Sequence, residues 1–247
     1  MSKRIALVTG GIGGIGTSIC QQLAKDGHTV VANYITPEAE KAQAWLTAQR
    51  AAGHDMHIAE GDVSNFESCS AMAAKIQAEV GVVEILVNNA GITKDGTFKK
   101  MPLENWVAVI NINLNSVFNV SKQFLDGMLE KGWGRIINIS SINGQKGQFG
   151  QTNYSAAKAG MHGFTKALAQ ETAAKGITVN TISPGYIGTE MVMAVQEDIR
   201  KQIIAGIPVG RLGKPEEIAK LISYLVSEDA AFITGANIAI NGGQHMS

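Results

Sequence analysis

The sequence predicts one α/β domain over residues 1–247, in which helices cover both faces of a parallel sheet. Short β-branched runs alternate with helical stretches along the whole chain, as in a doubly wound sheet. No Pro/Ser-rich linker, low-complexity tract or solenoid period divides it. A glycine-rich loop joins the first strand to the first helix. A single domain of this class follows from these observations.

Composition excludes several classes of function. Hydrophobic residues make up 45% of the chain, but none of its apolar runs reaches the ~18 residues that a membrane span needs. Lys+Arg and Asp+Glu are both 21, so no overall field favours nucleic acid or a membrane surface. Cys20 and Cys69 match no metal spacing, and no signal peptide precedes them. We therefore expect a soluble cytoplasmic protein without a metal site.

The pattern of apolar residues places the elements in order. Strands are predicted at residues 4–9, 29–34, 56–59, 84–87, 135–139, 177–182 and 237–240. Helices are predicted from the glycine loop to Asp26, at 37–52, 64–80 and 102–131, from Tyr154 onward, and at 215–227. Residues 189–212 break the alternation with an apolar helical insertion. We expect this insertion to be a small mobile lid over a cleft.

The glycine loop covers residues 10–16 and has the sequence Gly-Gly-Ile-Gly-Gly-Ile-Gly. It fits both G-x-G-x-x-G and T-G-x-x-x-G-x-G, the second through Thr9, Gly10, Gly14 and Gly16. Glycines let the backbone approach a pyrophosphate, and the helix that follows offers free N–H groups to it. A loop of this kind alone is weak support, but its position after the first strand predicts a Rossmann-type dinucleotide site.

The end of the second strand bears on which dinucleotide is bound. NAD-specific folds usually carry an acidic residue there, which binds the ribose 2′-hydroxyl. Residues 33–36 are Asn, Tyr, Ile and Thr, so no carboxylate opposes a 2′-phosphate. No arginine replaces it, and the nearest cation is Lys41. We predict NADP(H) in preference to NAD(H), with NAD(H) possible.

Polar and small residues follow other strands at the same edge of the sheet. Asp62 and Val63 follow the third strand, Asn88-Asn-Ala-Gly91 the fourth and Ser183-Pro-Gly-Tyr186 the sixth. These positions suit contacts with a ligand, although a polar turn explains the 88–91 segment equally well. Asn111, Asn113 and Asn115 lie inside a predicted helix where asparagine is unfavourable, so at least one should have a buried role.

A serine, a tyrosine and a lysine lie together in residues 140–158. Tyr154 and Lys158 are spaced i and i+4 on one helical face, so their polar ends can meet. A nearby ammonium lowers a phenol pKa, which would make Tyr154 a general acid or base. Ser141 follows a buried strand and could hold a carbonyl oxygen beside the phenol. A helix start capped by Thr152 or Asn153, with Tyr154 only packing, is the alternative.

Together these residues resemble the short-chain dehydrogenase/reductase family over essentially the whole chain. The resemblance implies a seven-stranded parallel sheet, commonly in a tetramer. It implies a catalytic set of Asn113, Ser141, Tyr154 and Lys158. It also implies a cofactor site made of Gly10, Gly14, Ile15, Gly16, Asp62, Val63, Asn89, Ala90, Gly91, Tyr154, Lys158, Pro184, Gly185, Ile187 and Thr189.

Within the family, segments 88–95, 140–154 and 183–191 resemble acetoacetyl-CoA reductases of polyhydroxyalkanoate synthesis. This implies NADPH-dependent reduction of acetoacetyl-CoA to (R)-3-hydroxybutanoyl-CoA. Asp95, Gln148, Phe149, Gln151 and Tyr186 are the predicted substrate residues, with loop packing as their alternative. Lys94, Lys99, Lys100, Lys146, Arg211 and Lys214 could meet the CoA phosphates, although scattered lysines are usually solvated.

Two other functions are compatible with this pattern. A 3-oxoacyl-[acyl-carrier-protein] reductase has the same chemistry, but such enzymes often carry extra cations beside the fifth strand. Here Gly132 and Trp133 occupy that place, with Lys131 before them. A non-catalytic NADP-sensing protein is the second alternative, and the intact catalytic set of Asn113, Ser141, Tyr154 and Lys158 argues against it.

Overall fold

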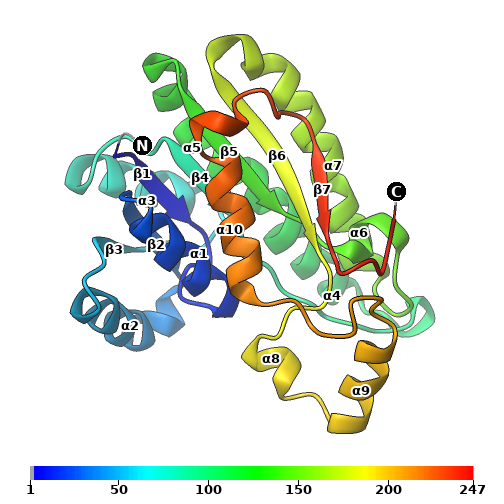
Figure 1. The fold of residues 1–247 in the computed structure, drawn as a ribbon. Coiled ribbons are helices and arrows are strands. Elements are labelled where there is room, and N and C mark those ends of the chain that lie inside the picture. Colours follow the sequence, from blue (N-terminus) through cyan, green and yellow to red (C-terminus); the bar gives the residue numbers. More distant parts are fainter. Residues whose placement is uncertain (1–2, 247) are drawn as a thin grey trace.

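A computed structural model describes residues 3–246 and contains one seven-stranded, fully parallel sheet. Its strand order is β3-β2-β1-β4-β5-β6-β7 (Figure 1). The strands are β1 Ile5–Val8, β2 Thr29–Tyr34, β3 Met56–Glu60, β4 Ile85–Asn88, β5 Gly134–Ile139, β6 Ile177–Pro184 and β7 Asn237–Ile240. Each predicted strand is therefore present, with its ends shifted by at most two residues. The predicted fold class is confirmed.

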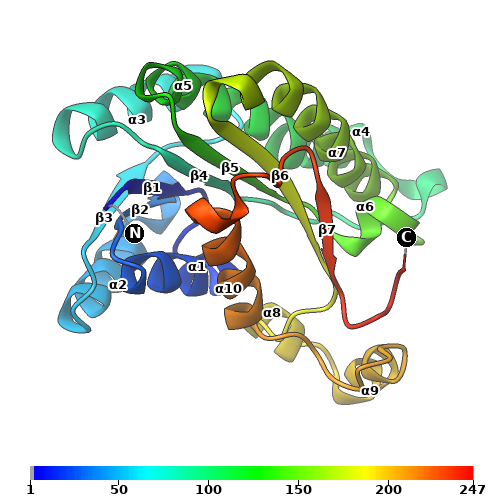
Figure 2. The same ribbon diagram turned by 45° about the horizontal axis from the view of Figure 1, so that its top comes forward.

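Helices cover both faces of the sheet (Figure 2). One layer contains α1 Gly14–Lys25, α2 Ala39–Ala51 and α10 Pro215–Leu225. The other contains α3 Phe66–Glu79, α4 Leu103–Ile110, α5 Ser116–Lys131, α6 Ile142–Lys146 and α7 Thr152–Thr172. Short 3-10 helices occupy Thr36–Glu38 (η1), Phe98–Lys100 (η2), Ala173–Lys175 (η4) and Glu228–Ala230 (η5). The sheet is thus the middle of three layers.

The central strands supply side chains to both layers. Ala6 and Val8 of β1 join one buried apolar cluster, with Ile19 and Leu23 of α1. Leu7, between them, belongs to the other cluster. Successive side chains of a strand point to opposite faces, so a strand buried on both sides must be apolar throughout. This explains the unbroken β-branched runs in the sequence.

The strand order reverses between β1 and β4, which lie side by side although two other strands, β2 and β3, separate them in the chain. The loops after these two strands diverge to opposite faces of the sheet and leave a crevice at the carboxyl ends, where ligands of such sheets bind. Here they are joined: the Thr9 hydroxyl accepts hydrogen bonds from the backbone N–H groups of Asn89 and Ala90, each at 3.0 Å. The predicted cofactor segments therefore meet at this edge.

Two local features differ from the prediction. Residues 102–131 do not form one helix, because a π-helical turn, η3 Asn111–Asn115, separates α4 from α5. The five-residue helix α6 after Ser141 was not expected at all. Both depend on hydrogen bonds from side chains, which apolar periodicity does not report.

The insertion at 189–212 contains two short helices, α8 Glu190–Met193 and α9 Glu197–Ala205. They lie beyond the carboxyl ends of β6 and β7 (Figure 1). A parallel bridge between Ile187 and Gly213 closes the base of the insertion. Across residues 3–246, no helix has the length and apolar character needed to cross a membrane.

Candidate active site

The predicted catalytic group lies after β5 and at the start of α7. Ser141 caps α6, and its hydroxyl accepts a hydrogen bond from the Asn143 N–H at 3.1 Å. Tyr154 is the third residue of α7. A hydrogen bond with Ser141 lowers the pKa of the Tyr154 phenol, but burial raises it more, and Asp95 adds to the rise. The structure thus brings Ser141 and Tyr154 together.

Lys158 is buried one turn further along α7, with an exposed fraction of 3%. Its ammonium donates a hydrogen bond to the Ile139 carbonyl at 2.7 Å and lies 5.6 Å from the centre of the Tyr154 ring. Burial lowers the pKa of Lys158 to about 7. A lysine near neutrality stabilises a phenolate weakly.

The expectation that Lys158 lowers the pKa of Tyr154 is therefore wrong for this structure. The net shift of the Tyr154 pKa is upward, and its downward contribution comes from Ser141. The physical reason is that α7 and β5 bury both side chains, so desolvation outweighs their proximity. The phenol is therefore protonated at neutral pH and has a proton to donate, and the raised pKa makes it a weaker acid than free tyrosine.

Asn113 occupies the π-helical turn and is fully buried. Its amide nitrogen donates hydrogen bonds to the carbonyls of Ile92 and Val109, both at 2.9 Å. Its Oδ1 atom is buried without a hydrogen-bond partner among the described residues. A Cβ atom at Gly91 would lie 2.5 Å from that oxygen and 3.4 Å from the Lys158 ammonium. Only glycine fits at 91, and an unpaired buried acceptor beside it suggests that a ligand or water completes the group.

The glycine loop has the shape that a bound pyrophosphate requires. A Cβ atom at Gly16 would lie 2.2 Å from the Gly10 carbonyl oxygen, so no larger residue allows this tight turn. The loop leads into the N-terminus of α1, and no side chain caps that end. Its uncapped N–H groups can receive an anion. These residues therefore fit a dinucleotide.

The second strand contributes in a way that the sequence did not indicate. Asn33 is buried, its Oδ1 accepts from the Gly10 N–H at 3.2 Å, and its amide donates to the Gly61 carbonyl at 2.9 Å. It thereby joins the glycine loop to the end of β3. At the surface beyond it, the Thr36 hydroxyl donates to Glu60 Oε1 at 2.6 Å. A carboxylate from β3 therefore stands near this edge, although β2 supplies none.

Asp62 and Val63 follow β3 at the predicted position. Asp62 is exposed, and its Oδ1 accepts hydrogen bonds from the N–H and hydroxyl of Ser64 at 2.9 and 2.7 Å. Val63 is buried, and its carbonyl accepts from Asn119 of α5 at 3.1 Å. The segment is held rigidly where an adenine is expected.

The segment after β6 runs from the sheet to the insertion. Pro184 ends the strand, and Gly185 lies against Asn241 after β7. Thr189 begins the insertion, and a Cβ atom added to Gly14 would lie 3.4 Å from its side chain. The start of the insertion therefore lies over the glycine loop, as a cover for a dinucleotide should. Ile15 packs partly buried against the core.

Two of the predicted substrate residues, Asp95 and Gln151, are joined by a hydrogen bond close to the start of α7. The Gln151 side chain donates from Nε2 to Asp95 Oδ2 at 2.8 Å, and its Oε1 accepts from the Asn143 side-chain amide at 2.9 Å. Gln148 accepts from Lys146 at 3.0 Å, and Phe149 is 87% exposed. Asn143 was not foreseen, because its sequence position after Ser141 shows no pattern. Asp95 and Gln151 are therefore joined, whereas Phe149 contacts little.

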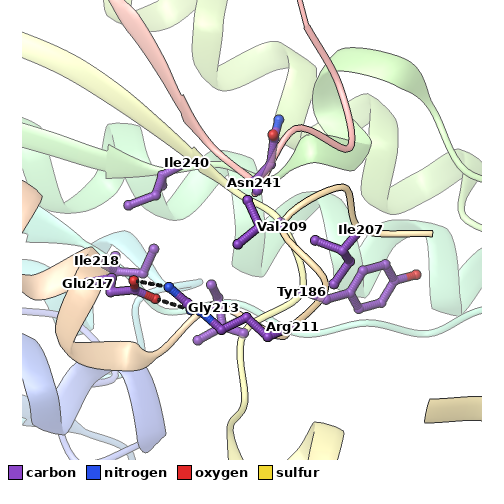
Figure 3. A pocket seen from close by; sticks show the side chains of 12 residues that line it. Tyr186, Ile207, Val209, Arg211, Gly213, Glu217, Ile218, Ile240 and Asn241 are labelled. Atoms are coloured by element: carbon purple, nitrogen blue, oxygen red, sulfur yellow. Dashed lines mark hydrogen bonds and ion pairs between the residues drawn. The ribbon is translucent and has the colours of Figure 1, made fainter. Parts of the chain in front are cut away.

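Tyr186 is among the residues that line a cavity of about 180 Å³ between the ends of β6 and β7 and the insertion, and its ring extends away from Val209 and Ile240 (Figure 3). Arg211 and Glu217 form a two-fold hydrogen bond at its rim, at 2.9 and 2.7 Å. The described lining includes none of Ser141, Tyr154 and Lys158. Within residues 3–246, no three His, Cys, Asp or Glu side chains are grouped to hold a metal ion.

Comparison with known proteins agrees with this geometry. The family model described as short chain dehydrogenase matches residues 4–200. An acetoacetyl-CoA reductase of Allochromatium vinosum is 61% identical over 98% of this chain and 99% of its own. That of Cupriavidus necator is 58% identical over 100% of both chains. A nodulation protein G of Azospirillum brasilense is 62% identical over 98% of each chain.

Proposed function

The chain belongs to the short-chain dehydrogenase family, and we propose that it reduces acetoacetyl-CoA to (R)-3-hydroxybutanoyl-CoA for polyhydroxybutyrate synthesis. The observation that carries the reaction is Tyr154, protonated and held against Ser141 beside buried Lys158. The substrate rests on two full-length relatives named acetoacetyl-CoA reductase. As a member of this family the chain is an oxidoreductase that uses a nicotinamide cofactor.

When bound, a nicotinamide dinucleotide supplies the hydride for the 3-keto carbon. Ser141 and Tyr154 donate hydrogen bonds to the keto oxygen, and Tyr154 gives its proton as charge develops there. At neutral pH the Tyr154 phenol holds the proton that this step transfers. Lys158 holds the nicotinamide ribose, as the family resemblance implies. Asn113 Oδ1, which has no described partner, holds a water that returns the proton.

We propose NADP(H) in preference to NAD(H), because residues 33–36 place no acid at the end of β2. The uncapped α1 terminus is available to phosphate oxygens, whereas the Thr36 hydroxyl already donates to Glu60 Oε1. A homotetramer and a cytoplasmic location are further proposals, from the family resemblance and from two free buried cysteines. We also propose that residues 1–247 form one domain with a lid at 189–212, and the bridge between Ile187 and Gly213 at the base of that segment supports this.

The surroundings of Trp133 support CoA, rather than an acyl-carrier protein, as the carrier of the substrate. The guanidinium carbons of Arg4 and Arg135 lie 4.1 and 4.3 Å from its ring centre. Two cations therefore occupy a neighbourhood that the sequence appeared to leave neutral. Arg4 is paired with Glu84, and both arginines lie near Glu228. Because nearby carboxylates already balance these charges, they offer little to an acidic carrier protein.

The direct test follows NADPH and NADH oxidation with acetoacetyl-CoA, beside a Tyr154→Phe variant. We expect rapid loss of NADPH, slower loss of NADH, and a rate lower by about a thousandfold in the variant. Faster NADH oxidation would overturn the cofactor preference alone. Activity only on carrier-linked thioesters would replace the substrate. Equal dinucleotide binding with no turnover by either protein would indicate a sensor.

A further inference from the structure

Ser140, which precedes the catalytic serine, has no part in the reaction proposed above, yet it is buried with an exposed fraction of 3%. Its hydroxyl donates a hydrogen bond to the carbonyl of Lys158 at 2.8 Å. The neighbouring carbonyl of Ile139 accepts from the Lys158 ammonium at 2.7 Å. Residues 139 and 140 therefore hold Lys158 by its backbone and by its side-chain end.

His162 stands behind Ser140, one helical turn beyond Lys158. Its Nε2 atom lies 2.9 Å from the Ser140 hydroxyl and 3.4 Å from that of Ser183. Ser183 in turn donates to Asn237 Oδ1 on β7 at 2.7 Å. The imidazole thus lies between the strand end that leads to Ser141 and the one that leads to Pro184.

The directions of these bonds fix the histidine tautomer. A serine hydroxyl has one proton to donate, and a carbonyl oxygen can only accept a hydrogen bond. The Ser140 proton is therefore directed at the Lys158 carbonyl. The histidine must then donate from Nε2 to the Ser140 oxygen. Burial lowers the pKa of His162, so the ring is neutral at pH 7 and this tautomer is a defined state.

We infer that Ser140 and His162 are positioning residues, which lock the backbone of Lys158 to the end of β5 and thereby set the catalytic lysine and Tyr154. A side chain that must meet reacting atoms needs its backbone fixed, and small displacements cost rate. The contacts of both residues in this arrangement are with protein groups of α7, β6 and the residue that follows β5. The inference rests on the proposed function only for its kinetic readout.

Two variants, one at Ser140 and one at His162, test this positioning role. Ser140→Ala removes the hydroxyl, and His162→Leu removes the donor. His162→Gln retains an N–H donor at a similar reach. We expect kcat to fall about tenfold or more in the first two, with KM for acetoacetyl-CoA within about twofold, and to be largely restored in His162→Gln.

A matched control comes from β6. The Thr178 hydroxyl is buried without a partner among the described residues, so Thr178→Val removes a buried hydroxyl that holds nothing. It should leave kcat unchanged. If Thr178→Val and Ser140→Ala lower kcat equally, or if His162→Gln is as slow as His162→Leu, the positioning role is overturned.

A spectroscopic readout is independent of activity. Nitrogen NMR of the histidine rings reports the tautomer, and we expect His162 to carry its proton on Nε2. We also expect that proton to exchange faster with water in Ser140→Ala. An Nδ1–H tautomer would refute the lock even in an active enzyme. An inactive natural chain with the Nε2–H tautomer would refute the proposed substrate but not the lock.

Discussion

At the scale of single residues, the environment of Lys158 shows how burial affects the charges of the site. It is buried on α7, and the Ile139 carbonyl is the partner of its ammonium. The spacing from Tyr154 was predictable, because i and i+4 positions share a helical face. The sign of the phenol pKa was not, because it depends on how much α7 and β5 exclude water. Local spacing places side chains, but burial decides their charge.

Burial of Lys158 also makes stability depend on pH. Its pKa is lowered from 10.5 to about 7. Below about pH 7 the lysine is protonated in both states, so the buried charge lowers stability in full. Between about pH 7 and the ordinary lysine pKa of 10.5, the unfolded chain binds more protons than the folded protein, so stability rises with pH.

We therefore expect Lys158→Met to raise the free energy of unfolding at pH 7 by a few kcal/mol, and by less at pH 9, while activity is lost. Unfolding in guanidinium at pH 7 and at pH 9 measures the free energy of unfolding of the variant and of the natural chain. Lys166, exposed on the same helix, supplies the control Lys166→Met. An equal gain at pH 7 and pH 9 would contradict the assignment.

At the scale of elements, apolar periodicity predicted all seven strands, including β3 and β7, which are only partly buried. It did not predict the π-helical turn at Asn111–Asn115. That turn is held by the Asn113 amide on the Ile92 carbonyl, a residue that is distant in the chain. π-helical turns often mark functional sites. The run of asparagines was the only local sign of it.

The β2–β3 edge shows how an element can be misread from one strand. The sequence after β2 has no acid, yet the register pairs Tyr34 with Glu60 and places a carboxylate beside Thr36. A carboxylate there repels a 2′-phosphate and tolerates a 2′-hydroxyl. Strand pairing, which one strand's sequence does not contain, thus limits the preference for NADPH.

Glu60→Gln should accordingly raise the ratio of kcat/KM for NADPH to that for NADH by about threefold, the scale of one exposed charge. The rise should shrink as salt is added. Glu79→Gln, at the far end of α3, removes an equally exposed charge as a control. No change in the ratio would mean that Glu60 lies outside the reach of the ribose.

At the scale of the whole molecule, net charge was a poor guide to local charge. Lys+Arg and Asp+Glu balance at 21 each. The loops at 94–101 and 146–151 are nevertheless joined by a hydrogen bond from the Gly96 N–H to the Gly150 carbonyl at 2.8 Å. They carry exposed Lys94, Lys99, Lys100 and Lys146 around Asp95. Phe98 and Phe149 are also exposed there, by 76% and 87%.

Together, residues 94–101 and 146–151 suit the phosphates and adenine of CoA, because lysines attract phosphate and phenylalanines can stack on a base. Acetoacetyl-pantetheine carries the same keto acyl group without those phosphates. The double variant Lys99→Gln/Lys100→Gln should raise KM for acetoacetyl-CoA about fivefold and leave that for acetoacetyl-pantetheine unchanged. Lys131→Gln/Lys175→Gln, at exposed lysines next to the amino ends of β5 and β6, is the charge-matched control. An equal rise in KM for both thioesters would show that the substitutions disturb the loops themselves. An unchanged KM for both thioesters would show that these lysines contact only solvent.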